Sequence, residues 1–160
     1  MKFADYLCED LIFLDACFSS KEEAIEYLTG ELCRYYNLNH HKEMLNDICK
    51  RENLKSTGLG KRLALPHGRT DLADKLYIVF ARCDNGVDWR SIDGLPVNFV
   101  FLIVGPARLE TEYLQVLGDI SRIMIRHEVV ESLRKARNAK EIIKIIKDSG
   151  IRKGNRKNEG

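Results

Sequence analysis

The chain has 160 residues, a length typical of one domain, and its 44% hydrophobic content is enough to bury a core without disulfide or metal staples. Lysine and arginine total 26 against 24 aspartate and glutamate, and the excess lies in the last ten residues, so the rest of the chain is nearly neutral. A neutral body has no global field that gathers nucleic acid or acidic lipid, so we expect neither as a partner.

The cysteines and the apolar segments indicate the compartment. The five cysteines are widely spaced, and no two form a Cys-x-x-Cys pair, which argues against a disulfide framework or a zinc ribbon. No run of about 18 apolar residues is present, and acidic residues interrupt the apolar stretch near the N-terminus. We therefore expect reduced thiols, no membrane insertion and a cytoplasmic location.

The first third of the chain predicts a short strand followed by two helices. Leu11 to Leu14 is apolar and rich in strand-forming residues. Ser20-Lys21-Glu22-Glu23 has the S-x-x-E pattern of a helix start, and apolar residues then recur every three or four positions to about Tyr36. A second helix is expected from a cap at Asn39 to about Arg51.

The next segment interrupts regular structure. Ser56 to Gly60 predicts a loop, Leu63-Ala64-Leu65 a brief extended stretch, and Pro66-His67-Gly68 a turn. The segment Thr57 to Arg62 has the glycines of a phosphate loop, but the Walker pattern requires serine or threonine where Arg62 stands. A tight glycine turn that directs backbone amides toward a small anion stays open as an alternative.

The remainder predicts buried strands and then helices. Leu76 to Cys83 and Val97 to Val104 are nearly continuous in β-branched and aromatic residues, as in strands covered on both faces, and Val87 to Ile92 is expected to form a short strand between two turns. Helices are expected over Glu110 to Arg126, Glu128 to Arg137 and Ala139 to Asp148. This order predicts an α/β fold, a three-layer helix/sheet/helix sandwich with a central mixed β-sheet.

Among the four histidines, His67 has the setting of a reactive group. It follows a proline, precedes a glycine and lies just beyond an apolar stretch. A neutral imidazole can attack an electrophile through one nitrogen if its other nitrogen is held as a hydrogen-bond donor. The alternative is a turn histidine whose ring caps the strand, and the residues alone leave both interpretations open.

The stretch from Arg51 to Gly68 resembles the active-site signature of type 2 enzyme IIA domains of the bacterial phosphoenolpyruvate-dependent phosphotransferase system, the fructose/mannitol and nitrogen-regulatory family. The resemblance implies that residues 1–150 form one enzyme IIA-like domain and that residues 151–160 form a basic, disordered tail. The signature positions are filled by Glu52, Leu59, Gly60, Leu63, Ala64, Leu65, Pro66, His67 and Gly68.

The resemblance also implies a function. His67 would accept a phosphoryl group from the phosphorylated histidine-containing carrier protein and pass it to an enzyme IIB or to a regulated protein. Arg51 matches the active-site arginine of the family, while Thr57 and Gly58 match its Thr-Gly turn, so these residues are expected to hold the phosphate without metal or cofactor. No channel or second transfer domain accompanies the sequence, so we favour regulation, as in standalone nitrogen-type members, over sugar uptake.

Two positions depart from the pattern of the family. Tyr113 stands where the family usually places a second histidine, and a tyrosine carries no positive charge near pH 7. Lys61-Arg62 replaces the usual small-residue pattern, which would alter how the carrier docks. Arg69 or Arg108 would compensate for the missing charge. An intact site makes the chain a phosphotransferase-type phosphohistidine carrier, and the alternative is a phosphorylation-impaired regulatory binding module.

Overall fold

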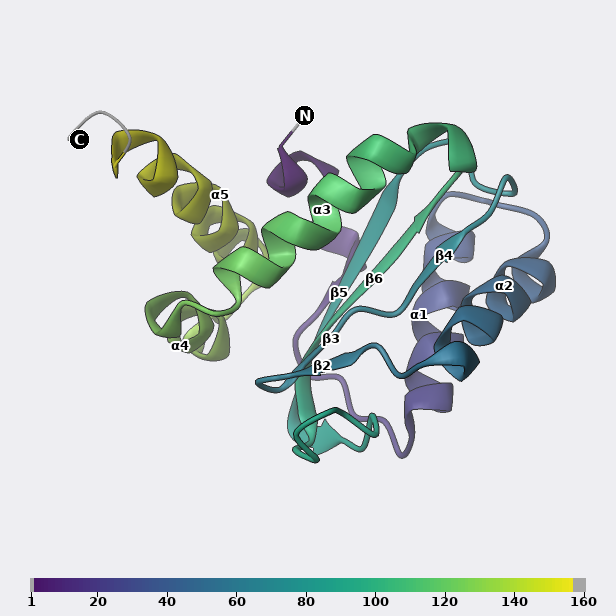
Figure 1. The fold of residues 1–160 in the computed structure, drawn as a ribbon, viewed down its shortest axis with the longest axis horizontal. Helices are drawn as coiled ribbons and strands as arrows, with labels where there is room; N and C mark the ends of the chain where they lie inside the picture. Colours follow the sequence, from purple (N-terminus) through teal and green to yellow (C-terminus); the bar gives the residue numbers. More distant parts are fainter. Residues whose placement is uncertain (1, 157–160) are drawn as a thin grey trace.

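The computed structural model describes residues 2–156, and the side chains of residues 2–150. A mixed six-stranded sheet forms the centre, in the order β1-β5-β6-β3-β2, and β4 pairs with β6 beside β3 (Figure 1). The strands are β1 Ile12–Phe13, β2 Gly58–Gly60, β3 Leu63–Ala64, β4 His67–Arg69, β5 Tyr77–Val87 and β6 Val97–Gly105.

Helices cover both faces of this sheet. The pair α1 and α2 packs on one face, whereas α3 crosses the other face, with α4 and α5 beyond it (Figure 1). The predicted three-layer α/β sandwich is therefore confirmed. The helices are α1 Lys21–Tyr35, α2 His41–Leu54, α3 Glu110–Ile123, α4 His127–Lys135 and α5 Ala139–Arg156, with 3₁₀ turns η1 Phe3–Tyr6, η2 Glu9–Leu11 and η3 Ala107–Leu109.

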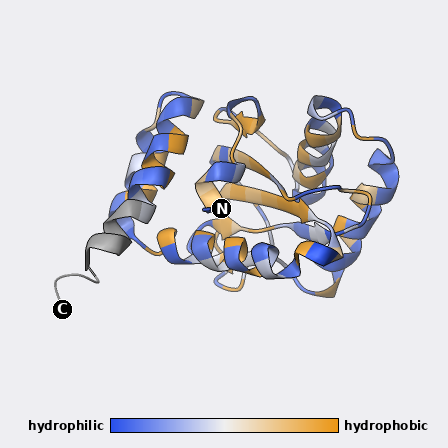
Figure 2. Cartoon of the chain, turned by 90° about the horizontal axis from the view of Figure 1, so that it is seen from above, coloured by the Kyte–Doolittle hydropathy of each residue, from blue (hydrophilic) through white to orange (hydrophobic). Residues whose placement is uncertain are grey.

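The two long strands separate two hydrophobic cores. Along β5 and β6, alternate side chains point to opposite faces, as the two-residue period of a strand requires. Phe80, Phe99 and Phe101 pack toward α3, whereas Val79 and Val100 pack toward α1 and α2. The apolar strands lie between the helices in Figure 2, which explains why both strand sequences are almost continuously apolar.

The start of α1 agrees with the prediction, and that of α2 does not. The Ser20 side chain accepts a hydrogen bond from the backbone N–H of Glu23, as the S-x-x-E pattern predicts. The cap of α2 is His40, at φ 68°, and its side chain makes no capping bond, so the expected cap at Asn39 is wrong by one residue. Helix α2 also continues beyond Arg51 to Leu54.

Three predictions for the middle of the chain are wrong. The predicted loop over residues 56–60 contains β2, and the predicted turn at Pro66-His67-Gly68 is instead the start of β4, which runs parallel to β6. The predicted strand Val87 to Ile92 is also wrong, because β5 continues to Val87 through an irregularity near Gly86, where φ is 76°, and residues 88–92 form no strand. Pairing with β6 therefore overrides the local turn signals in β4 and β5, whereas β2 forms through its pairing with β3.

The C-terminal helix is longer than the expected Ala139 to Asp148. Helix α5 continues to Arg156, so the tail predicted for residues 151–160 begins within it, and residues 157–160 lie outside the described part of the chain. Over residues 2–156, no helix combines the length and apolar character needed to span a bilayer.

Candidate functional site

The pairing of β4 with β6 positions His67. His67 is aligned with Ile103 of β6, so the side chains of Leu65, His67 and Arg69 all face α3. The His67 side chain is half-buried and lines a pocket of about 320 Å³. The pocket is walled by α2, the β2 region and α3, through Arg51, Lys55, Ser56, Thr57, Leu59, Leu65, Ile92, Leu117, Gly118 and Ser121.

Gly68 allows α2 to approach the opposite face of β4. A Cβ atom at this position would lie 2.9 Å from Cγ1 of Ile48 on α2, which is closer than packed atoms tolerate. The absence of a side chain at Gly68 therefore sets the spacing between β4 and α2. Because Arg51 follows Ile48 by one helical turn, this spacing also brings the Arg51 guanidinium to the pocket of His67.

The imidazole of His67 is held by its own strand. Nδ1 lies 2.7 Å from the carbonyl oxygen of Leu65. A carbonyl only accepts hydrogen bonds, so Nδ1 carries the proton and Nε2 keeps its lone pair. Burial lowers the pKa of His67 below its ordinary value and outweighs the hydrogen bond to the Leu65 carbonyl, which acts to raise it; the positive charge of Arg51 adds a smaller lowering effect. The ring is therefore neutral near pH 7.

Arg51 supplies positive charge at the edge of the pocket. Its Nη1 donates a hydrogen bond to the carbonyl of Lys55, 3.0 Å away, which ties the guanidinium to the end of α2. Within the described residues, neither Arg51 nor Lys55 forms an ion pair. Both cations are therefore available to an anion in the pocket.

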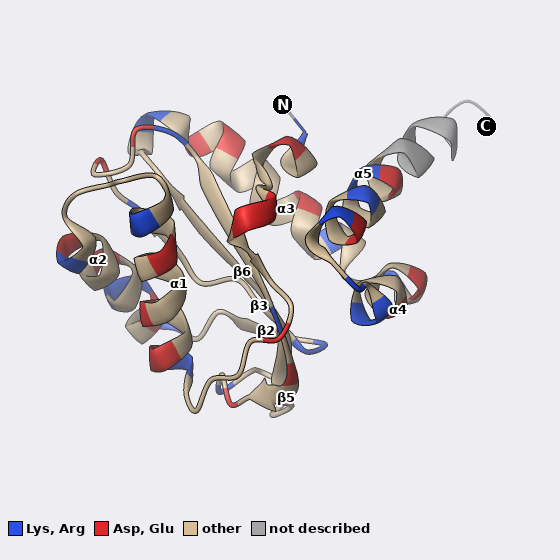
Figure 3. Ribbon diagram, turned by 180° about the vertical axis from the view of Figure 1, so that it is seen from behind, with Lys and Arg blue, Asp and Glu red and all other residues tan. Residues whose placement is uncertain are grey.

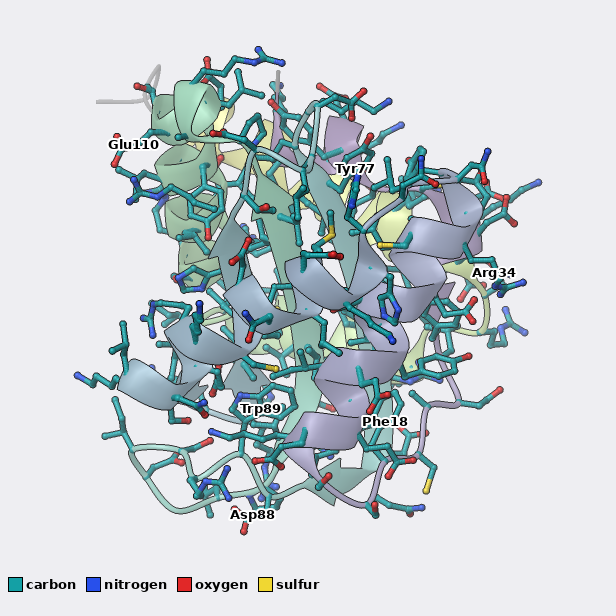
Figure 4. The ribbon with its side chains drawn as sticks, turned by 90° about the vertical axis from the view of Figure 1, so that its right-hand side faces the viewer. Phe18, Arg34, Tyr77, Asp88, Trp89 and Glu110 are labelled. Atoms are coloured by element: carbon teal, nitrogen blue, oxygen red, sulfur yellow. The ribbon has the colours of Figure 1, made fainter. Side chains whose placement is uncertain are left out.

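A buried carboxylate organises the floor of the site. Glu52 is 4% exposed and forms an ion pair with Nζ of Lys21, at 3.0 Å, which links α2 to the start of α1. Glu52 also accepts hydrogen bonds from the backbone N–H of Thr57, at 2.9 Å, and from its hydroxyl, at 2.5 Å. Trp89 adds a bond from Nε1 to the Thr57 hydroxyl, at 3.2 Å, and Figure 4 shows its ring behind α1 and α2.

These bonds differ from the expectation for the Thr-Gly turn. Both donors of Thr57 point to Glu52, and the backbone N–H of Gly58 donates to Oγ of Ser56 at 3.1 Å. None of the three is free for a phosphate oxygen while these bonds are made. Position 58 must also lack a side chain, because a Cβ at Gly58 would lie 2.3 Å from Oγ of Ser91. The turn therefore braces Glu52 and the loop that contains Ser91.

Tyr113 lies beside His67. The resemblance predicts this, because Tyr113 stands at the position of the second histidine of the family. The two ring centroids are 5.7 Å apart, with the rings at 69°, and Cζ of Arg69 lies 5.9 Å from the Tyr113 centroid. Tyr113 is 2% exposed, and its hydroxyl has no hydrogen-bond partner among the described residues. Burial raises the pKa of Tyr113, so the phenol stays protonated at neutral pH.

The two arginines expected to compensate for Tyr113 occupy different places. Arg69 pairs with Glu110 on α3 at 2.7 Å and lies next to Tyr113, so its charge is close to the site. Arg108 instead donates to the backbone carbonyl of Asp74. The structure thus brings His67, Arg51 and Tyr113 together, and leaves Arg108 outside the pocket.

Two features of the site were missed from the sequence. The Leu65 carbonyl fixes the tautomer of His67, and Lys21 neutralises the buried Glu52 from another helix. The only sequence signal for the second feature is the acidic residue that opens the signature. A buried carboxylate needs a partner, and this requirement by itself would not identify Lys21 among the many lysines.

Comparison with known proteins identifies relatives of this chain. Residues 5–149 match the family model described as phosphoenolpyruvate-dependent sugar phosphotransferase system, EIIA 2. A nitrogen regulatory protein from Bradyrhizobium diazoefficiens is 28% identical over 146 residues, which cover 91% of this chain and 95% of that protein.

Solved structures agree with the match. The nitrogen regulatory protein IIA-Ntr of Neisseria meningitidis superposes with a TM-score of 0.83 at 29% identity, over 89% of this chain and 97% of the other. The mannitol enzyme IIA of Escherichia coli, in its complex with phosphorylated enzyme IIB, gives a TM-score of 0.75 at 24% identity, over 89% and 97%. The second likeness concerns the fold alone.

Removal of the Glu52 carboxylate is expected to destabilise the protein strongly. Glu52→Ala leaves the Lys21 ammonium buried without a counter-charge, which predicts a loss of about 3–5 kcal/mol in the free energy of unfolding. Urea denaturation measures it, and fluorescence of the single tryptophan, Trp89, reports from the same network. The matched control is Glu110→Ala, which breaks an exposed pair with Arg69 and predicts a loss of at most about 1 kcal/mol. Equal losses in the two variants would contradict the role of Glu52.

Proposed function

Because the chain belongs to the EIIA 2 family of the phosphoenolpyruvate-dependent sugar phosphotransferase system, we propose that it carries a phosphoryl group on Nε2 of His67. The observation that supports this most strongly is the 2.7 Å contact between Nδ1 and the Leu65 carbonyl. It leaves Nε2 as the nucleophilic atom, in a residue that lines a pocket together with Arg51, which forms no ion pair within the part of the chain that the structure describes.

The proposed step is an exchange between two histidines. The Nε2 lone pair of His67 attacks the phosphorus atom of the phosphorylated donor, and the bond from phosphorus to the donor nitrogen breaks, with its electron pair returning to the donor ring. The His67 ring becomes more positive as the new bond forms. The Leu65 carbonyl stabilises that charge through the Nδ1 proton, as a positioned hydrogen-bond acceptor does in general.

Arg51 and Lys55 stabilise the transferring group in this proposal. Negative charge spreads over three phosphoryl oxygens during transfer, so catalysis consists mainly of positioning and charge stabilisation. A guanidinium can donate to two of these oxygens at once. The bond from Arg51 to the Lys55 carbonyl leaves further guanidinium donors for this purpose. Thr57 and Gly58 act indirectly, by bracing the Glu52 network.

The donor is proposed to be the phosphorylated histidine-containing carrier protein. The acceptor is either an enzyme IIB, with which a protein of the same fold was solved, or a protein regulated by the phosphorylation state of this chain. Regulation is favoured over sugar uptake because nitrogen regulatory proteins align over 95% and 97% of their own length; a fructose-specific EIIA component of Haloferax volcanii aligns over 89% of its length and keeps uptake as the competing role. A cytoplasmic location belongs to the same proposal, since all five cysteines are free, as is usual in a reducing compartment.

A second candidate function is a binding module with impaired phosphoryl transfer. It is favoured by Tyr113, whose hydroxyl is buried without a partner, and by the donors of Thr57 and Gly58, which are engaged within the protein. In this alternative the pocket binds a partner, and phosphorylation of His67 contributes little.

Phosphoryl labelling tests the first function. With enzyme I, the carrier protein, Mg²⁺ and phosphoenolpyruvate, the native chain should gain acid-labile, alkali-stable phosphate, and His67→Ala should gain none. His127→Ala, a histidine at the start of α4, is the matched control and should be labelled like the native chain. Equal labelling of the His67→Ala chain would refute the assignment.

The pH dependence of labelling is expected to follow the ionisation of His67. Burial lowers its pKa below the ordinary value of 6.5, so the nucleophilic neutral ring predominates at every pH above that value. The second-order rate constant should be flat from about pH 7 upward and should fall only as the pH drops below 6.5. Stopped-flow or rapid-quench transfer from a pre-phosphorylated carrier measures this. A decline that begins above pH 7 would contradict a depressed pKa.

Substitution of Tyr113 separates the two candidate functions. If the native site transfers phosphate well, Tyr113→His should change the rate less than about threefold, because Arg51 already supplies the charge. If the site is impaired, the added histidine should raise the rate by roughly one to two orders of magnitude, the value of a charge-assisted bond. Tyr113→Phe, which keeps the ring beside His67, is the control for packing. Rapid-quench kinetics distinguishes the outcomes.

A further inference from the structure

The turn between β2 and β3 has an unusual sequence for its conformation. Gly60 pairs with Leu63, so Lys61 and Arg62 form a two-residue hairpin loop, and their φ angles are 55° and 64°. Positive φ at both positions is the geometry of a type I′ turn, in which Asn-Gly is preferred because side chains with a Cβ disfavour the left-handed region. Local conformational preference therefore does not explain a Lys-Arg pair here.

The neighbouring chain holds this strained turn in place. The backbone N–H of Lys61 donates to the Asp93 carboxylate at 2.9 Å, and the Arg62 carbonyl accepts from the backbone N–H groups of Asn98 and Phe99 at 2.9 and 3.1 Å. All three bonds involve backbone atoms of the turn. They would form equally with Asn-Gly, so the two cationic side chains are not required for the fold. Strained residues of this kind concentrate at functional positions.

The Lys61 side chain lies on a surface beside the pocket of His67, and Arg62 follows it in the same turn. Lys61 is exposed, and neither it nor Arg62 forms an ion pair within the described residues. The guanidinium of Arg62 donates a hydrogen bond to Oδ1 of Asn98 at 3.4 Å, and it lies close enough to the Asp93 carboxylate to interact with its charge. Lys61 lines a hollow of about 210 Å³ together with Leu59 and Ile125, which are 47% and 61% exposed. Leu59 also lines the pocket of His67, so the two hollows are adjacent.

We propose that Lys61 and Arg62 form a docking element that recognises carboxylates on the phosphoryl donor protein. This inference rests on the proposed function and names the chemistry of its partner. A donor that reaches His67 must cover this face, where Arg51 and Lys55 are also cations without ion pairs among the described residues. In Figure 3 the turn is a blue loop that projects from the sheet beside the β2 and β3 labels. Carboxylates opposite it would compensate the charge, while an apolar side chain of the donor would enter the hollow of Leu59 and Ile125.

Two double variants test the docking element. K61E/R62E should raise the KM for the phosphorylated carrier about tenfold with little change in kcat, and should weaken the dependence of the rate on salt. K61N/R62G restores the preferred turn residues, so it should raise the denaturation midpoint and still raise the KM. K140E/K144E makes the same change in net charge on exposed residues of α5 and should leave the KM unchanged. A KM for K61E/R62E equal to that of the α5 control would overturn the inference.

A binding measurement separates failure of the inference from failure of the proposed function. If the native chain is not labelled, the proposed function fails, and calorimetric titration with the unphosphorylated carrier then tests docking alone. The inference predicts measurable binding that K61E/R62E weakens about tenfold and K140E/K144E does not. Absence of binding, or equal affinity for the two variants, would overturn it. Normal labelling with identical kinetics in both variants would overturn the inference and leave the proposed function standing.

Discussion

The Leu65 carbonyl and Nδ1 of His67 face each other across two residues of one extended segment, and the chemistry of the site depends on that contact. The contact forms where the chain continues from Pro66 into β4 along β6. The sheet pairing therefore selects one tautomer. Burial then keeps the ring neutral, so the lone pair of Nε2 is available at physiological pH.

The second constraint is the distance between α2 and the sheet. Gly68 sets the contact with Ile48, and the buried pair of Glu52 with Lys21 connects α2 to α1. A buried ion pair contributes little net stability by itself, because desolvation offsets its attraction. Its contribution here is positional, since Glu52 also holds both donors of Thr57 and immediately follows the Arg51 that faces the pocket. A hydrophobic replacement would fill the space but leave the turn unbraced.

Much of this architecture could be predicted from local sequence, and the exceptions share one cause. Apolar runs identified β5 and β6, and the S-x-x-E pattern identified the start of α1, because these signals depend on neighbouring residues. The turn expected at Pro66 was wrong because β4 exists only through parallel pairing with β6, which no local pattern encodes. The resemblance in sequence anticipated Tyr113 beside His67, but the roles of Thr57 and of the Leu65 carbonyl depend on contacts that only the folded chain makes.

The position of the phosphate on the imidazole tests the role of the Leu65 carbonyl in phosphoryl transfer. The ¹⁵N chemical shifts and the phosphorus–nitrogen couplings of the His67 ring, measured by NMR on the ¹⁵N-labelled and phosphorylated chain, distinguish the two nitrogens. We expect phosphate on Nε2, with Nδ1 still protonated and bonded to the Leu65 carbonyl. Phosphate on Nδ1 would require that hydrogen bond to be broken and would contradict the proposed mechanism.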